Sequence, residues 1–206
     1  MRKTIIFDFD GTIADSFIFI KNILLDLSSE FGYKKPTEKE IAVLRAKPPL
    51  EIFKYVGISN YKLPFLILRV QKEMHIQIEN IRPIQGIEEA LHDLKAKGFV
   101  LGIVSSNNSK NIAAFLKKNN LLFFDFIQSE SSIFGKARVL HNVLKKHKID
   151  KNKAIYVGDE IRDIEAAKKV GIKIISVSWG FNDSKGLEKY HPDALIDKPS
   201  QLLSSI

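Results

Sequence analysis

Short apolar runs that end abruptly in polar residues are the feature that most restricts the fold of this chain of 206 residues. These runs cover residues 4–9, 100–104, 154–157, 173–179 and 194–196. Runs without polar alternation predict strands that are buried on both faces, as in a parallel sheet. Helical patterns occupy residues 87–97, 109–119, 136–148 and 160–170. Strands that alternate with helices predict an α/β fold built on a doubly wound parallel sheet.

Residues 16–81 break this alternation, because they contain helical patterns and no comparable strand. An apolar stripe with three- and four-residue spacing opens the segment: Phe17, Ile20, Leu24, Leu27 and Phe31, followed by Gly32. The stripe predicts a helix that packs along this face. Thr37 and Glu40 form a capping-box pattern ahead of a second helix. We therefore expect an α-helical cap, residues 16–81, inserted after the first strand into a core of residues 1–15 and 82–206.

Two aspartates lie at the end of the first apolar run, Asp8 within its last residues and Asp10 directly after it, and they are the most informative residues of the chain. Asp8 and Asp10 are two positions apart, so on a strand they start on the same side. Carboxylates at that range resist ionising together unless a cation lies with them. Mg²⁺ accepts such carboxylates together with water and phosphate oxygens. Gly11 permits a tight turn and Thr12 offers a hydroxyl. An isolated pair of this kind would more often be an ordinary acidic turn, so the other strand ends matter.

Further acidic residues follow the run at 154–157. Asp159 lies at the strand end, which makes it a candidate metal ligand, while Glu160 and Asp163 fall in the first turn of the next helix. Acidic residues there also stabilise a helix start. Alternatively, Asp163 orients the surroundings of the ligand or pairs with a lysine. Ligands of open parallel sheets bind beyond the carboxyl ends of the strands, so these residues and Asp8 should converge.

Phosphate-binding candidates follow the run at 100–104. Ser105, Ser106 and Asn107 combine hydroxyl groups with backbone N–H groups at a helix start, which can cradle a phosphate, although such a stretch is more often only a turn and a cap. Lys136 begins a helical pattern, where its charge opposes the helix dipole. This position hints that Lys136 neutralises a phosphate or a carboxylate cluster.

The order of these sites resembles the four motifs of the haloacid dehalogenase (HAD) superfamily. The stretch from Asp8 to Thr12 resembles its D-x-D-G-T/V motif, Ser105 and Lys136 resemble the second and third motifs, and Gly158 to Asp163 resembles G-D-x-x-x-D. The predicted helical insert resembles the C1-type cap of the phosphoglycolate phosphatase-like branch. The resemblance implies a HAD core, which is Rossmann-like, and a phosphatase of small phosphorylated metabolites, with phosphoglycolate as the favoured substrate.

The resemblance also implies a role for each residue. Asp8 is the nucleophile that forms an aspartyl phosphate, and Asp10 is the acid and base. Mg²⁺ is held by the Asp8 carboxylate, the Asp10 backbone carbonyl and Asp159. Glu160 and Asp163 support this site. The phosphoryl oxygens are bound by a larger set, namely Gly11, Thr12, Ser105, Ser106, Asn107 and Lys136.

Related activities are less well matched. Dehalogenases of the superfamily attack carbon and lack an acid at the position of Asp10. Sugar-phosphate mutases carry a cap histidine where this chain has residues 17–20, which contain none. Phosphonatase-like enzymes need a cap lysine, and Lys21 lies near that region, so this alternative stays open. A non-catalytic binding protein that retains the fold is disfavoured because all four motif positions are intact.

Composition excludes several other classes. Without cysteine the chain forms no disulfide, thiol nucleophile or Cys-ligated metal centre. A net charge of +8 would suit nucleic acid. The lysines, however, lie in pairs along helical stretches without interleaved aromatic residues, so we expect no nucleic-acid partner. The first apolar run is too short for a signal segment or a membrane span, so we expect a cytoplasmic protein without a membrane partner. The sequence makes no prediction of oligomeric state.

A basic loop in the cap is a candidate for substrate selection. Arg45 and Lys47 lie between the expected early cap helices, in a stretch that often faces the catalytic crevice of cap-bearing relatives. Arginine there could grip a second anionic group of the substrate. Solvated charges at a helix end, where cations are favourable in any case, are the slightly preferred interpretation.

Overall fold

The structure is a computed structural model that describes residues 2–130 and 135–206. Its centre is a sheet of six parallel strands in the order β3-β2-β1-β4-β5-β6. The strands are β1 (Thr4–Phe7), β2 (Val100–Ser105), β3 (Phe126–Ser129), β4 (Ala154–Gly158), β5 (Lys173–Val177) and β6 (Ala194–Ile196). The predicted fold class, a doubly wound α/β core, is confirmed.

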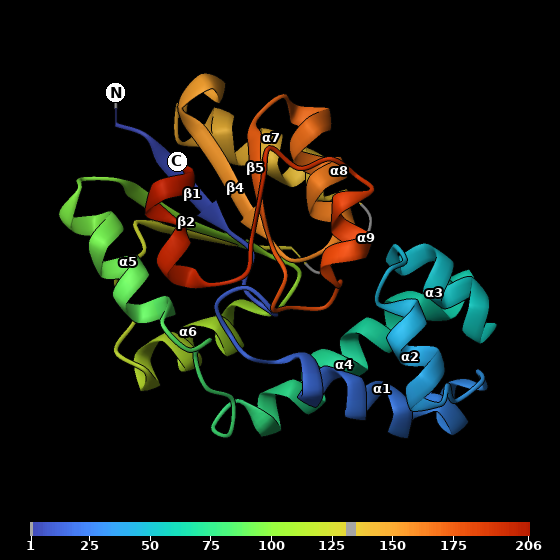
Figure 1. The fold of residues 1–206 in the computed structure, drawn as a ribbon. Coiled ribbons are helices and arrows are strands. Elements are labelled where there is room, and N and C mark those ends of the chain that lie inside the picture. Colours follow the sequence, from blue (N-terminus) through green and yellow to red (C-terminus); the bar gives the residue numbers. More distant parts are fainter. Residues whose placement is uncertain (1, 131–134) are drawn as a thin grey trace.

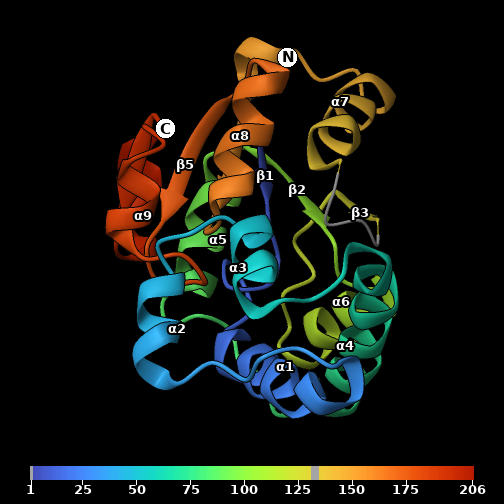
Figure 2. The same cartoon turned by 90° about the vertical axis from the view of Figure 1, so that its right-hand side faces the viewer.

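Helices cover both faces of this sheet (Figures 1 and 2). Ile5 and Phe7 pack on one side with α5 (Ile87–Ala96) and α6 (Ser109–Lys118). Ile6 packs on the other side with α7 (Lys136–Lys146), α8 (Ile161–Val170) and α9 (Ser184–Glu188). Successive residues of a strand point to opposite faces, so an uninterrupted apolar run fills both cores at once. Short 3₁₀ turns complete the chain at Asn60–Lys62, Lys151–Lys153, Pro199–Gln201 and Leu203–Ser205.

Some elements differ from the sequence prediction. β3 was not expected, because it is a short edge strand that contains Gln128 and Ser129 and pairs only with β2. α9 is a single short turn of helix with little apolar pattern. β1 and β5 end two residues earlier than the apolar runs do. The chain leaves the sheet after Phe7 because the N–H groups of Ile13 and Ala14 turn back to bond the Phe9 carbonyl.

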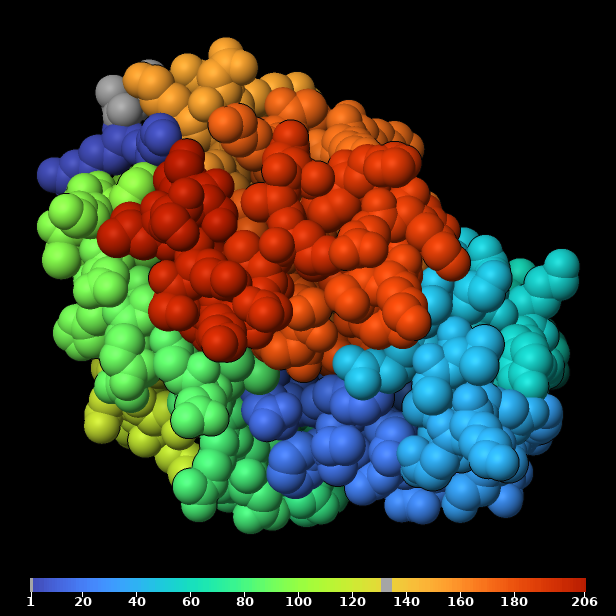
Figure 3. All heavy atoms as spheres, in the orientation of Figure 1, coloured from blue at the N-terminus to red at the C-terminus, as the bar shows by residue number. Residues whose placement is uncertain are grey.

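The segment between β1 and α5 is helical: α1 (Phe17–Phe31), α2 (Glu38–Leu44), α3 (Pro49–Val56) and α4 (Leu63–Gln77). The capping box of Thr37 and Glu40 is present at the start of α2, as the sequence predicts. These helices lie together beyond the carboxyl ends of the strands (Figure 1), and they contact the C-terminal part of the core (Figure 3). The division at residues 15/16 and 81/82 stays a prediction. No helix in the described ranges is long and apolar enough to cross a bilayer.

Most of the α1 stripe packs as the sequence predicts, because Ile20, Leu24 and Phe31 lie against the core cluster that includes Leu27. Only Leu27 of the five residues is buried. Phe17, Ile20 and Leu24 are half-buried and line a cavity between cap and core. Spacing alone identifies a common face of a helix, whereas the presence of a filled or an empty space opposite depends on tertiary structure.

Candidate active site

The candidate site lies where the strand order reverses. β1 pairs with β2 on one side and with β4 on the other, and the chain passes between these halves of the sheet after β3. Asp8, Ser105 and Asp159 therefore meet at the carboxyl ends of three neighbouring strands, which is where open parallel sheets form their ligand crevice. All three are buried, with at most 3% of each residue exposed.

The Asp8 carboxylate is fixed by one backbone hydrogen bond and one ion pair. The Phe9 N–H donates to Asp8 Oδ1 at 2.8 Å, and Lys136 Nζ lies 2.7 Å from Asp8 Oδ2. Lys136 also donates to Asp163 and lies over the ring of Tyr156. Burial alone would lower the pKa of Lys136, but the carboxylates of Asp163 and Asp8 raise it above its ordinary value. Lys136 is thus a cation held between two buried acids.

Three buried acids form a cluster that fits a divalent cation. Asp8, Asp159 and Asp163 each place a carboxylate oxygen within 4.8 Å of the other two. Burial, with the charges of Glu160, Asp8 and Asp163, raises the pKa of Asp159 well above its ordinary value. Burial also raises the pKa of Asp163 to about 6, against the lowering effect of Lys136. Carboxyl groups that are buried so close together can all be ionised only if positive charge lies near them. A set of oxygen donors suits a hard divalent ion.

Asp159 is enclosed by loops from both ends of the chain. Thr12 Oγ1 donates to Asp159 Oδ1 at 2.8 Å, and the Phe181 N–H donates to Oδ2 at 2.7 Å. Gly11 has φ of +74°, and a Cβ there would lie 2.3 Å from Asp159 Oδ2. A Cβ at Gly180 would lie 2.1 Å from the same oxygen. Only glycine permits this approach, so both loops hold the carboxylate in one place.

The Asp10 carboxylate has different hydrogen-bond partners from those of Asp8 and Asp159. Its carboxylate accepts from Ser16 Oγ at 2.9 Å and from Asn107 Nδ2 at 2.8 Å. Burial, and then the charge of Asp8, raises the pKa of Asp10 to about 6, although the two hydrogen bonds lower it. A carboxyl group with this pKa can hold a proton or release it near neutral pH.

The remaining predicted core residues lie around these acids. Ser105 Oγ accepts from the Asn107 N–H at 3.0 Å, which shapes the loop after β2. Ser106 accepts a bond from Gln71 of the cap at its backbone carbonyl. Glu160 and Asp163 form a capping box at the start of α8, and Glu160 Oε1 accepts from Arg162 Nε at 2.9 Å.

The basic cap loop contacts the core. Arg45 Nε donates to the Phe181 carbonyl at 3.0 Å and its Nη2 donates to the Gly180 carbonyl at 2.7 Å. Its guanidinium also lies 4.6 Å from the ring centre of Phe17. Lys47 forms an ion pair with Glu51 at 3.0 Å. Contact of either residue with substrate stays a prediction, and both charged groups have protein partners here.

Several residues of the site were missed from the sequence. Asn182 is buried; its Nδ2 donates to the carbonyls of Arg45 and Lys47, and its Oδ1 accepts from the Ile161 N–H. Gly180, Phe181 and Asn182 follow β5, so the rule that strand ends form the crevice would have found them. Ser16 carries no such signal, because it joins the site only after the chain turns back.

Comparisons with known proteins agree with this geometry. Residues 5–177 match the family of haloacid dehalogenase-like hydrolases. The chain is 35% identical over 205 residues to a phosphoglycolate phosphatase from Synechococcus elongatus, covering 99% of this chain and 97% of that relative. It is 26% identical to pyrophosphatase PpaX from Bacillus mycoides, over 98% of this chain and 95% of that one. A haloacid dehalogenase-like hydrolase structure from Streptococcus pneumoniae superimposes with a TM-score of 0.80 at 26% identity, covering 98% and 97% of the two chains.

The protein has an α/β fold with a cluster of buried acids at the carboxyl edge of a parallel sheet, and the family match extends over most of the chain. The protein belongs to the haloacid dehalogenase-like hydrolases, as the motif resemblance predicts. The predicted enzyme class, a phosphohydrolase, is confirmed as well.

Proposed function

We propose that this protein is a Mg²⁺-dependent phosphatase that hydrolyses small phosphate monoesters through a phosphoaspartate on Asp8. The position of the Asp8 carboxylate carries the proposal: it is buried at the end of the central strand, 2.7 Å from the Lys136 ammonium. Asp8, Asp159 and the Asp10 backbone carbonyl would hold Mg²⁺, which neutralises charge on the phosphoryl oxygens. The residue roles predicted from the sequence are part of this proposal.

The reaction has two displacements at phosphorus. First, an Asp8 carboxylate oxygen bonds to phosphorus while the bond from phosphorus to the ester oxygen breaks, and Asp10 donates its proton to that oxygen. Next, a water oxygen bonds to phosphorus, Asp10 takes the water proton, and the bond from phosphorus to Asp8 breaks. Lys136 and Ser105 hold phosphoryl oxygens in both steps. A pKa of about 6 suits Asp10 to both transfers.

Phosphoglycolate is the first substrate to test, because a relative of 35% identity carries that name. Phosphate release should require Mg²⁺, disappear with EDTA and return when Mg²⁺ is added in excess. Asp8→Asn should abolish turnover without unfolding the protein, because the amide keeps the size of the side chain but cannot form the acyl phosphate. Asp93→Asn, on the exposed face of α5, is the matched control. Full activity of Asp8→Asn or of the metal-free protein would refute the proposal.

A further inference from the structure

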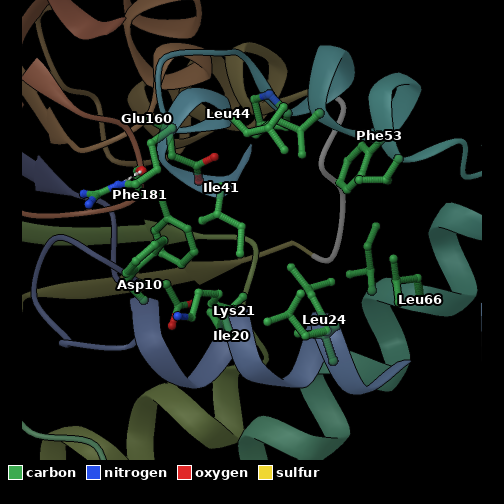
Figure 4. Close-up of a pocket in the computed structure, with 18 of the residues that line it drawn as sticks. Asp10, Ile20, Lys21, Leu24, Ile41, Leu44, Phe53, Leu66, Glu160 and Phe181 are labelled. Carbon is green, nitrogen blue, oxygen red and sulfur yellow. Dashed lines mark hydrogen bonds between the residues drawn. The ribbon is translucent and has the colours of Figure 1, made fainter. Parts of the chain in front are cut away.

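A cavity of about 280 Å³ lies between the cap and the core and opens onto Asp10 (Figure 4). Ser106 and Asn107 also line it, and Asn107 Nδ2 donates to Asp10. Figure 4 shows Asp10 and Glu160 toward one end, and Phe53 and Leu66 of the cap toward the other. The leaving group of a phosphate ester whose phosphorus faces Asp8 can therefore extend into this cavity.

The cap end of this cavity is apolar. Its wall includes Ile20 and Leu24 of α1, Ile41 and Leu44 of α2, and Phe53 of α3. Four of these side chains are half-buried, and they line the free space of the cavity. Apolar cavities of about 150 Å³ bind benzene in other proteins, which makes this one large enough for a ring or a short alkyl chain.

The four cations of the cavity wall already have partners. Lys21 pairs with Glu38 at 3.0 Å and Lys47 pairs with Glu51 at 3.0 Å. Arg45 donates to backbone carbonyls of the core. Arg162 donates to Glu160.

Two side-chain amides that line the cavity also donate hydrogen bonds to backbone carbonyls. Gln71 Nε2 donates to the Ser106 carbonyl at 2.7 Å, and Asn182 Nδ2 donates to the Arg45 and Lys47 carbonyls. A carboxylate or a second phosphate in the cavity would lose its water without gaining an uncommitted cation. The lining thus offers a second anionic group no cation that lacks a protein partner among the described residues.

We propose that the preferred substrate carries an aromatic or alkyl group on its alcohol side, and that this group fills the cap cavity. The inference rests on the proposed phosphatase function and specifies the substrate class of that same site. Phosphoglycolate and pyrophosphate are then poorer substrates, because neither carries an apolar group that can fill the cap cavity. Each methylene that enters the cavity should raise kcat/KM by about threefold to fourfold until the space is filled.

The test compares n-alkyl phosphates from ethyl to octyl, 1-naphthyl phosphate, phosphoglycolate and pyrophosphate by phosphate release. The inference expects kcat/KM to rise with chain length and then level off, with hexyl and naphthyl phosphate at least about tenfold better than phosphoglycolate. A flat series, or phosphoglycolate or pyrophosphate as the best substrate, would overturn the inference and leave the phosphatase function intact.

Two tryptophan variants test whether the cavity causes the dependence of kcat/KM on chain length. Leu24→Trp fills part of the cavity from α1, so kcat/KM should stop rising at a shorter alkyl chain than in the unaltered protein. Leu68→Trp adds the same ring on the exposed side of α4 and should leave the series unchanged. If both variants behave alike, the cavity is not the binding site.

Calorimetry with n-alkylphosphonates separates failure of the inference from failure of the function. These probes cannot be hydrolysed as esters, so their binding reports on the cavity alone. Affinity that grows with chain length, together with a negative heat-capacity change, supports the inference even if no ester releases phosphate. Affinity independent of chain length contradicts it.

Discussion

The carboxylate site of the core and the cavity of the cap differ in polarity, packing and dependence on sequence motifs. In the core, Asp8, Asp159 and Lys136 are buried, and each is held by charged or hydrogen-bonded partners. In the cap, half-buried apolar side chains surround free space of about 280 Å³. Preorganised charge stabilises a transition state, whereas apolar space selects by size and hydrophobicity. The proposed reaction and the proposed choice of substrate are therefore assigned to different parts of the chain.

Loss of Asp159 should lower kcat/KM more than loss of Asp10 or of Arg45, and by a similar factor for every substrate. Asp159→Asn removes a charged ligand from the acid cluster, so we expect kcat/KM to fall by at least about 1,000-fold for every ester. Titration with Mg²⁺ should show a raised requirement for the ion. Asp93→Asn serves again as control. A loss confined to one class of ester would show that the core also selects substrates.

Loss of Asp10 should depend on the leaving group but not on its size. Asp10→Asn cannot protonate an alkoxide, so hydrolysis of alkyl phosphates should fall by about 100-fold or more. p-Nitrophenyl phosphate needs little protonation of its leaving group and should lose much less. Equal losses for both esters would contradict the role of Asp10 as the acid of the first step.

Loss of Arg45 tests the connection between the two regions. Arg45→Ala removes two bonds to the loop that encloses Asp159, so we expect kcat/KM to fall by about tenfold for all esters. Lys47→Ala breaks only an exposed pair with Glu51 and should change activity by less than about threefold. A loss specific to phosphoglycolate in either variant would instead support the prediction that this loop grips an anionic substrate.

The positions of the core residues could be predicted because chemistry and topology agree there. Asp8, Ser105 and Asp159 each lie at the end of an apolar run or soon after it, and parallel strands bring such ends to one edge. Lys136 was suggested by its misfit at a helix start, and it lies between Asp8 and Asp163. For the cap, local signals predicted its helices, including the capping box at Thr37.

The remaining features depend on contacts between distant segments. The hydrogen bond from Asn107 to Asp10 and the bond from Thr12 to Asp159 join parts of the chain with no shared periodicity. The short edge strand β3 has too few apolar residues to be recognised alone. The α1 stripe looks the same in sequence whether it faces a filled core or a cavity, so the cavity could not be predicted.

Transfer of the phosphoryl group to Asp8 is the most direct test of the proposed function. Enzyme turning over a ³²P-labelled monoester with Mg²⁺ would be quenched in acid and digested, and the labelled peptide would be sequenced by mass spectrometry. We predict label on the peptide that contains Asp8, none in Asp8→Asn and none with EDTA. Phosphate release by the unaltered protein without label at Asp8, or with label on another residue, would contradict the proposed mechanism.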